Sequence, residues 1–206
     1  MSAQTIGLLS GGLVIASIVP YAIRVYERKI HPVPTSWILW SFIALAILLT
    51  YRSSGAEANM WPVVFGFFNP TIIVILSVWR HEKWKKLNEF EPYEWLCLVF
   101  GILSIVMWLF MRQSQELSQY ALYVAIVADT FAAIPTVILF KKEPEKDRPF
   151  SWFLFGVGYV IALFSITERT FANYALPIYL VAGSFTVTLL LVIPRIRRGI
   201  PLKEWI

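Results

Sequence analysis

The chain has 206 residues, of which 58% are hydrophobic and only 15% are charged, and its formal net charge is +5. Soluble domains average roughly 25% charged residues and 45–50% apolar ones, so this composition excludes a water-soluble globule and indicates a protein embedded in a lipid bilayer. Membrane topology accounts for the excess of basic residues, and we therefore expect no nucleic-acid partner.

Seven apolar segments are long enough to cross a bilayer, because a hydrocarbon core of about 30 Å needs roughly 20 apolar residues of helix. Backbone polar groups must pair internally in lipid, which favours helices. No basic residue precedes the first segment and Arg24 ends it, the reverse of a cleavable signal peptide, so it is predicted to be a membrane helix. The predicted spans are Thr5–Arg24, Thr35–Tyr51, Met60–Trp79, Tyr93–Met111, Leu117–Phe140, Phe150–Thr167 and Phe171–Ile193.

The basic residues are distributed unequally between the two sides of this topology. Of the 18 basic residues, all except Arg52, Arg112 and Arg169 fall on the side that holds the C-terminus. Short loops rich in Lys and Arg remain in the cytosol. The sequence therefore predicts an integral membrane protein with its N-terminus outside and its C-terminus cytosolic.

The chain also contains an internal repeat. Pro20 and Pro135 are 115 positions apart, and further matching pairs have the same offset without a gap: Pro34 and Pro149, Ser36 and Ser151, Trp37 and Trp152, Pro62 and Pro177, Thr71 and Thr186. We therefore assign residues 1–86 to a first three-helix repeat, 87–116 to a linker helix and 117–206 to a second repeat with a basic cytosolic tail.

This organisation predicts an all-α membrane protein of seven transmembrane helices, arranged as three plus one plus three. A three-helix unit crosses the membrane an odd number of times, so the linker helix gives the second copy the same orientation as the first. The two bundles are then parallel repeats, related by a pseudo-twofold axis along the membrane normal, and such repeats place a substrate path at their interface.

Each repeat contains a similar pair of short segments, with a proline late in its first helix. These segments are Ile18–Tyr21 with Ser36–Trp37 in the first repeat and Ala133–Thr136 with Ser151–Trp152 in the second. A three-plus-one-plus-three chain with a proline late in the first helix of each repeat resembles the PQ-loop superfamily, which includes the SWEET sugar transporters and their small prokaryotic relatives. The glutamine that names the superfamily is replaced by Tyr21 and Thr136. The resemblance implies a transporter of a small polar solute, such as a sugar, an amino acid or a vitamin, in the plasma (inner) membrane of a prokaryote.

Asp129 is the only acidic residue deep within a predicted span. A charge at this depth costs roughly 2.5–3.5 kcal/mol on insertion scales and usually has a partner or a function. We interpret Asp129 as a substrate-binding or proton-coupling carboxylate. The alternative is a structural acid that is hydrogen-bonded to neighbouring hydroxyls such as Thr130.

Other polar and aromatic residues share this depth or line the same helices. Asn69, Ser184 and Thr186 would complete a polar layer between the repeats, or else form hydrogen bonds between helices. Trp40 and Tyr159 are candidates for a cavity wall on which a flat or sugar-like solute stacks, whereas Trp37 and Trp152 are expected to anchor at the membrane interface. Pro20 and Pro135 each remove a backbone hydrogen bond, which suits hinges at a cytosolic gate or fixed kinks.

The sequence favours transport by alternating access over two other functions. A receptor or sorting protein on the same fold is the main alternative, and a lipid enzyme is weaker because only one deep carboxylate is present. We expect no catalytic residue and no cofactor. We also expect no metal site, because Cys97, His31 and His81 lie far apart in the sequence. A small-molecule substrate and the bilayer are the expected partners, and association into a homo-oligomer is left open.

Overall fold

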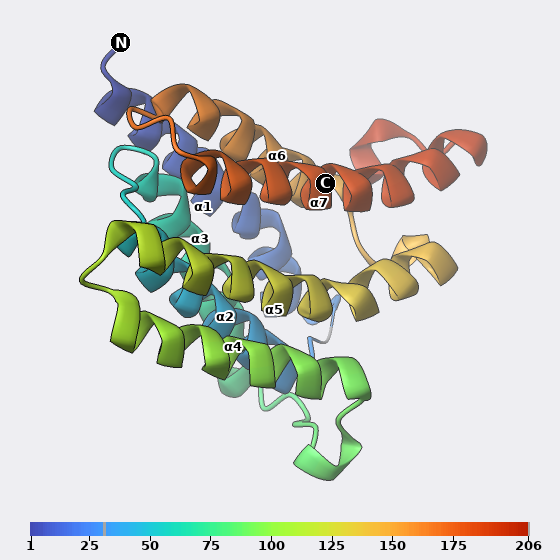
Figure 1. The fold of residues 1–206 in the computed structure, drawn as a ribbon. Helices are drawn as coiled ribbons and strands as arrows, with labels where there is room; N and C mark the ends of the chain where they lie inside the picture. Colours follow the sequence, from blue (N-terminus) through green and yellow to red (C-terminus); the bar gives the residue numbers. More distant parts are fainter. Residues whose placement is uncertain (31, 206) are drawn as a thin grey trace.

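The computed structural model describes residues 1–30 and 32–205, and over these residues it contains α-helices, short 3₁₀ turns and no β-strand (Figure 1). His31, in the first connection, lies outside the described residues. The helices are α1 (Ala3–Tyr26), α2 (Pro34–Ser53), α3 (Met60–Trp79), α4 (Pro92–Met111), α5 (Gln115–Lys142), α6 (Pro149–Ala162) and α7 (Phe171–Arg197).

Six helices, α1 to α5 and α7, are long and apolar enough to cross a membrane. The sixth predicted span, Phe150–Thr167, forms a shorter helix, because α6 ends at Ala162 and the turn Leu163–Ser165 is a 3₁₀ helix. The hydroxyl of Ser165 donates to the carbonyl of Ala162 (2.7 Å), and the backbone of Ile166 is extended, which ends the helix.

Six of the seven α-helices of the described chain, all except α3, begin in one of two ways. At the starts of α1, α5 and α7, a side-chain hydroxyl accepts a hydrogen bond from a backbone N–H of the first turn, which satisfies a donor that the helix leaves free. The starts of α2, α4 and α6 carry a proline, whose missing N–H costs nothing in the first turn. These residues are Ser2, Ser114 and Thr170 in the first case and Pro34, Pro92 and Pro149 in the second.

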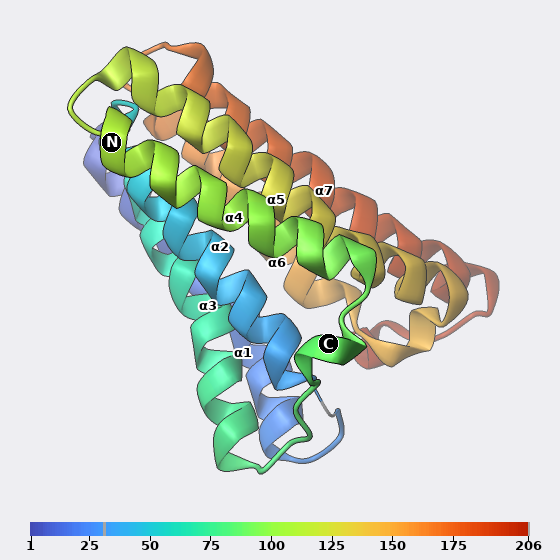
Figure 2. The same cartoon turned by 60° about the horizontal axis from the view of Figure 1, so that its bottom comes forward.

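The helices form two groups and a connecting helix. In the first group α3 packs against both α1 and α2, and in the second group α7 packs against both α5 and α6. The groups meet where α1 contacts α6 and where α2 contacts α5, and α4 packs against α5 and α2. Figure 2 shows the first and second groups close together at one end and diverging toward the other.

The two ends of the bundle differ in the connections that they carry. The end that holds the N-terminus also holds the connections 54–59, 112–114 and 163–170, and we call it the N-terminal end (Figure 1). The opposite end holds the connections 27–33, 80–91 and 143–148 and the C-terminal tail, and we call it the basic end because most Lys and Arg residues lie there.

Small residues bring α1 and α6 into close contact. A Cβ atom added at Gly158 would lie 2.7 Å from Cγ2 of Val14 and 3.2 Å from the carbonyl oxygen of Ser10, so only glycine fits here without a shift. The hydroxyl of Ser10 donates to the carbonyl of Gly158 across this contact (2.7 Å). The backbones of the two groups therefore approach each other closely near the N-terminal end.

Candidate functional site

A cavity of about 960 Å³ lies between the first and second groups. It extends from the middle of the helices toward the basic end, where Arg24 and Asp147 are among its lining residues. The residues predicted to bind a solute all line it: Trp40, Asn69, Asp129, Tyr159, Thr186 and Ser184. Of the two predicted hinges Pro135 lines the cavity, whereas Pro20 is not among the described lining residues.

Residues 115 positions apart line this cavity from both groups. The pairs include polar, aromatic and small side chains, and they come from corresponding helices in each group. The pairs within helices are Ser17 and Ala132, Ile18 and Ala133, Tyr21 and Thr136, Arg24 and Leu139, Ser36 and Ser151, Trp37 and Trp152, Trp40 and Phe155, Ala44 and Tyr159, and Asn69 and Ser184.

Asp129 lies at the middle of α5 and is buried. Its Oδ2 accepts a hydrogen bond from the hydroxyl of Tyr179 in α7 (2.9 Å), and the hydroxyl of Thr130 lies 3.2 Å from the same tyrosine oxygen. The neighbouring hydroxyl expected at Thr130 thus reaches Asp129 through Tyr179. Among the described residues, no basic side chain forms an ion pair with this carboxylate.

Asn69 lies at the middle of α3 with its amide oriented by α1. The amide nitrogen Nδ2 donates to the carbonyl of Val14 (3.0 Å) and lies 3.3 Å from the hydroxyl oxygen of Ser17. A carbonyl can only accept, so this contact fixes which end of the amide is nitrogen. The Oδ1 atom is buried without a hydrogen-bond partner among the described residues.

The remaining predicted residues form the walls around these two side chains. Ser184, at the middle of α7, is buried and donates its hydroxyl proton to the carbonyl of Leu180 (2.7 Å). Thr186 is exposed and donates to the carbonyl of Ala182 (2.7 Å). Tyr159 is buried, and its ring packs against that of Phe155 with the centroids 4.9 Å apart, while Trp40 is half-buried.

The mouth of the cavity contains the two tryptophans that were expected at the membrane interface. Trp37 packs against the ring of Tyr21 with the centroids 5.1 Å apart. Trp152 donates its indole N–H to Oδ2 of Asp147 (3.0 Å). Burial raises the pKa of the Asp147 carboxyl, and this effect outweighs the opposing hydrogen bonds and the nearby charges of Arg24 and Arg195.

Arg195 holds the connection that carries Asp147. It is 2% exposed, and its guanidinium donates to the carbonyls of Pro144 (2.9 Å), Leu191 (2.8 Å) and Asp147. The first and third of these carbonyls belong to the connection between α5 and α6. The end of α7 and the mouth of the cavity are therefore tied together by one buried side chain.

Hydrogen bonds between the two groups close the N-terminal end. The buried hydroxyl of Tyr51 in α2 donates to the carbonyl of Asn173 in α7 (2.9 Å) and accepts from the amide of Asn59. Four residues beyond Asn173 is Pro177, which has no N–H with which to bond that carbonyl within the helix. The tyrosine hydroxyl thus supplies the donor that the proline removes.

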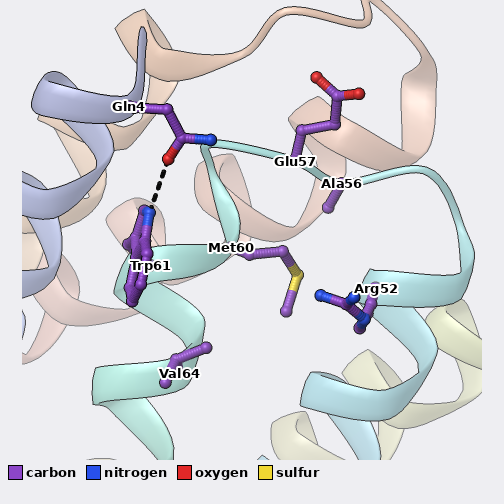
Figure 3. Close-up of a pocket in the computed structure, with 7 residues that line it drawn as sticks. All are labelled: Gln4, Arg52, Ala56, Glu57, Met60, Trp61 and Val64. Atoms are coloured by element: carbon purple, nitrogen blue, oxygen red, sulfur yellow. Dashed lines mark hydrogen bonds between the residues drawn. The ribbon is translucent and has the colours of Figure 1, made fainter.

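A smaller pocket of about 570 Å³ lies at the N-terminal end within the first group (Figure 3). It is lined in part by Arg52, Met60 and Val64, and the indole of Trp61 donates to the side-chain oxygen of Gln4 (2.8 Å) at its edge. None of the residues predicted to bind a solute lines it.

Sequence reasoning missed two features of the central site. Tyr179 has no charge, and the residue at the corresponding position of the first repeat is Val64, so neither signal marked it. Arg195 was assigned to topology together with the other basic residues, and nothing in the sequence distinguishes it as buried. Comparison with family models, with curated proteins and with solved structures gives no match to this chain.

Proposed function

We propose that this chain is a membrane transporter for a small polar solute and works by alternating access between two three-helix repeats. One observation carries the proposal: a cavity of about 960 Å³ between the two groups contains at mid-helix depth the buried carboxyl of Asp129, which forms no ion pair with the described residues. A buried charge without an ionic partner is expensive to keep in a membrane and is usually retained for function.

The contacts between helices support a repeat with a pseudo-twofold axis. Exchanging α1 with α5, α2 with α6 and α3 with α7 converts the contacts of α3 into those of α7. The same exchange converts the contact of α1 with α6 into that of α5 with α2. The cavity-lining pairs with an offset of 115 follow the same operation, and α4 is the linker helix without a counterpart.

The orientation in the membrane is proposed from charge. With the basic end in the cytosol, nearly all Lys and Arg residues satisfy the positive-inside rule. The cavity then opens toward the cytosol and is closed toward the outside by the contacts of Tyr51 and Ser10 with the second group. Transport would require these contacts to break while the basic end closes, with Pro20 and Pro135 as hinges.

Uptake into liposomes tests the proposal. The purified chain is reconstituted, and the entry of sugars, amino acids and vitamins is measured with and without a pH gradient, for the wild type and for Asp129→Asn. Transport that is lost or reduced in Asp129→Asn would support the proposal. A response of the flux to the pH gradient that is present in the wild type and absent in Asp129→Asn would assign proton coupling to this residue. Binding of a solute without any flux would instead favour a receptor or sorting function.

A further inference from the structure

The acidic residues that line the cavity differ in their surroundings. Glu94 forms an ion pair with Lys85, and Glu145 lies 3.4 Å from a guanidinium nitrogen of Arg198. Asp147 lies near the charges of Arg24 and Arg195. Asp129 is thus the acid in the cavity wall that lacks a basic neighbour in the described chain.

Several hydroxyl and amide protons of the cavity wall are already used by the protein itself. Ser184 donates to Leu180 (2.7 Å) and Tyr159 donates to the carbonyl of Pro62 (3.2 Å). The amide of Asn69 donates to α1, and the hydroxyl of Tyr179 donates to Asp129. Each of these groups therefore has only acceptor capacity left for a ligand.

Two side-chain oxygens of the cavity wall, one on Asn69 and one on Asp129, are available to accept a hydrogen bond from a ligand. Oδ1 of Asn69 is buried and has no hydrogen-bond partner among the described residues, to which this side chain bonds through Nδ2. Oδ1 of Asp129 remains available, because Tyr179 bonds to Oδ2. A buried acceptor without a partner is destabilising, so a ligand that donates a hydrogen bond to it would stabilise the protein.

Aromatic rings line the same part of the cavity. Trp40 and Phe155 occupy equivalent positions in the two groups, and Tyr159 packs against Phe155. Ring faces attract cations, most strongly where water is excluded. Trp40 also lines the cavity, and no hydrogen bond of its indole N–H is found among the described residues, so this donor is available to an oxygen of the ligand.

On these grounds we propose that the transported solute is a small organic monocation, with a protonated amine or amidine that donates hydrogen bonds to Asp129 and Asn69. This inference rests on the proposed function and narrows its substrate class. The charge balance opposes an anion at this depth, because the basic residues of the cavity wall lie at its mouth. Arg24, for example, is ten residues beyond Val14, about 15 Å along α1.

Two matched sets of probes test the charge of the ligand. The first set is glucosamine (as its cation), glucose and glucuronate, and the second is tryptamine (as its cation), indole-3-ethanol and indole-3-acetate. Within each set the skeleton is constant and the charge changes from positive to neutral to negative. Binding is measured as stabilisation of the purified chain against heat, and flux of the first set is measured in liposomes.

We expect the cation of at least one set to stabilise the chain at about a tenfold lower concentration than its neutral analogue, and the anion not to bind. Asp129→Asn should remove this preference, since the amide keeps the shape and the acceptor for Tyr179 but not the charge. The control Glu116→Gln makes the same change on an exposed residue of α5 and should keep the preference.

The contrary outcomes separate this inference from the proposed function. Flux of glucose or glucuronate equal to that of glucosamine would overturn the monocation inference and leave a transporter. A preference for cations that persists in Asp129→Asn would also overturn it. Binding of none of the six probes would count against the cavity as a solute site, and so against the proposed function.

Discussion

The closed N-terminal end depends on the hydroxyl of Tyr51, and the variant Tyr51→Phe tests this dependence. The hydroxyl is fully buried, donates to the carbonyl of Asn173 (2.9 Å) and accepts from Asn59. Phenylalanine retains the ring but removes the partner of the Asn173 carbonyl and of the Asn59 side-chain nitrogen, while the Asn59 side-chain oxygen still accepts from Glu57. Because Pro177 offers no N–H, the carbonyl of Asn173 has no substitute donor within its helix.

The size of the effect follows from these two lost bonds. A buried polar group without a partner costs about 1–3 kcal/mol. If the bonds exist only while this end is closed, the loss of one of them, at about 1–3 kcal/mol, already shifts the equilibrium toward the state that is open at the N-terminal end by about 5–150-fold, and the loss of both shifts it further. Amide hydrogen exchange in the connections 54–59 and 163–170 should accelerate accordingly.

A matched control separates gating from a general loss of stability. Tyr123 donates to Gln119 within α5 (3.0 Å) and makes no such bond between the groups, so Tyr123→Phe should leave exchange in these connections unchanged. Unchanged exchange at the N-terminal end of Tyr51→Phe, together with a lower melting temperature, would refute the reasoning. It would mean that the hydroxyl contributes equally to every state of the protein.

Three further predictions concern the basic end and the hinges. Arg195→Ala should lower the free energy of unfolding by about 3 kcal/mol or more, because three buried carbonyls lose a charged donor. The control Arg198→Ala changes an exposed residue and should alter the apparent melting temperature little. Equal effects of the two variants would contradict the stabilising role of the Arg195 hydrogen bonds. Pro20→Ala or Pro135→Ala restores a backbone hydrogen bond worth about 0.5–1.5 kcal/mol. Turnover in liposomes should therefore fall by about 2- to 10-fold at unchanged binding affinity. Unchanged turnover would show that the proline does not act as a hinge. Burial raises the pKa of the Asp147 carboxyl, so its protonated form stabilises the fold fully below the usual pKa of 3.8, and this stabilisation is lost as the pH rises through the raised pKa. Asp147→Asn should therefore make the melting temperature less dependent on pH in this range. Profiles of melting temperature against pH that run parallel for the wild type and the variant would show that the Asp147 carboxyl does not cause the dependence.

Much of the helical framework is predictable from the sequence, because the apolar runs are long and their ends carry turn residues. The predicted Met60–Trp79 coincides with α3, and α5 extends only two residues beyond Leu117–Phe140 at each end. The sixth span was predicted too long, because the run of apolar residues continues through Leu163 and Phe164 although the backbone leaves the α-helix there.

The candidate site was predictable where one residue contrasts with its surroundings. Asp129 is such a residue, a charge within an apolar run, and the repeat directed attention to Asn69 and Ser184. The partners of these residues were not predictable, because Tyr179 reaches Asp129 only through the packing of α5 against α7. The bond from Tyr51 to Asn173 likewise depends on where two distant helices meet.

The short α6 has a consequence for the surrounding lipid. Its 14 residues span about 21 Å, and the 3₁₀ turn that follows adds about 6 Å, which is less than a hydrocarbon core of about 30 Å. Its neighbours α1 and α7 are much longer, with 24 and 27 residues. Such hydrophobic mismatch is relieved by local thinning of the bilayer, so the membrane is expected to be thinnest beside α6. Lipids with long acyl chains would strain this side of the molecule first.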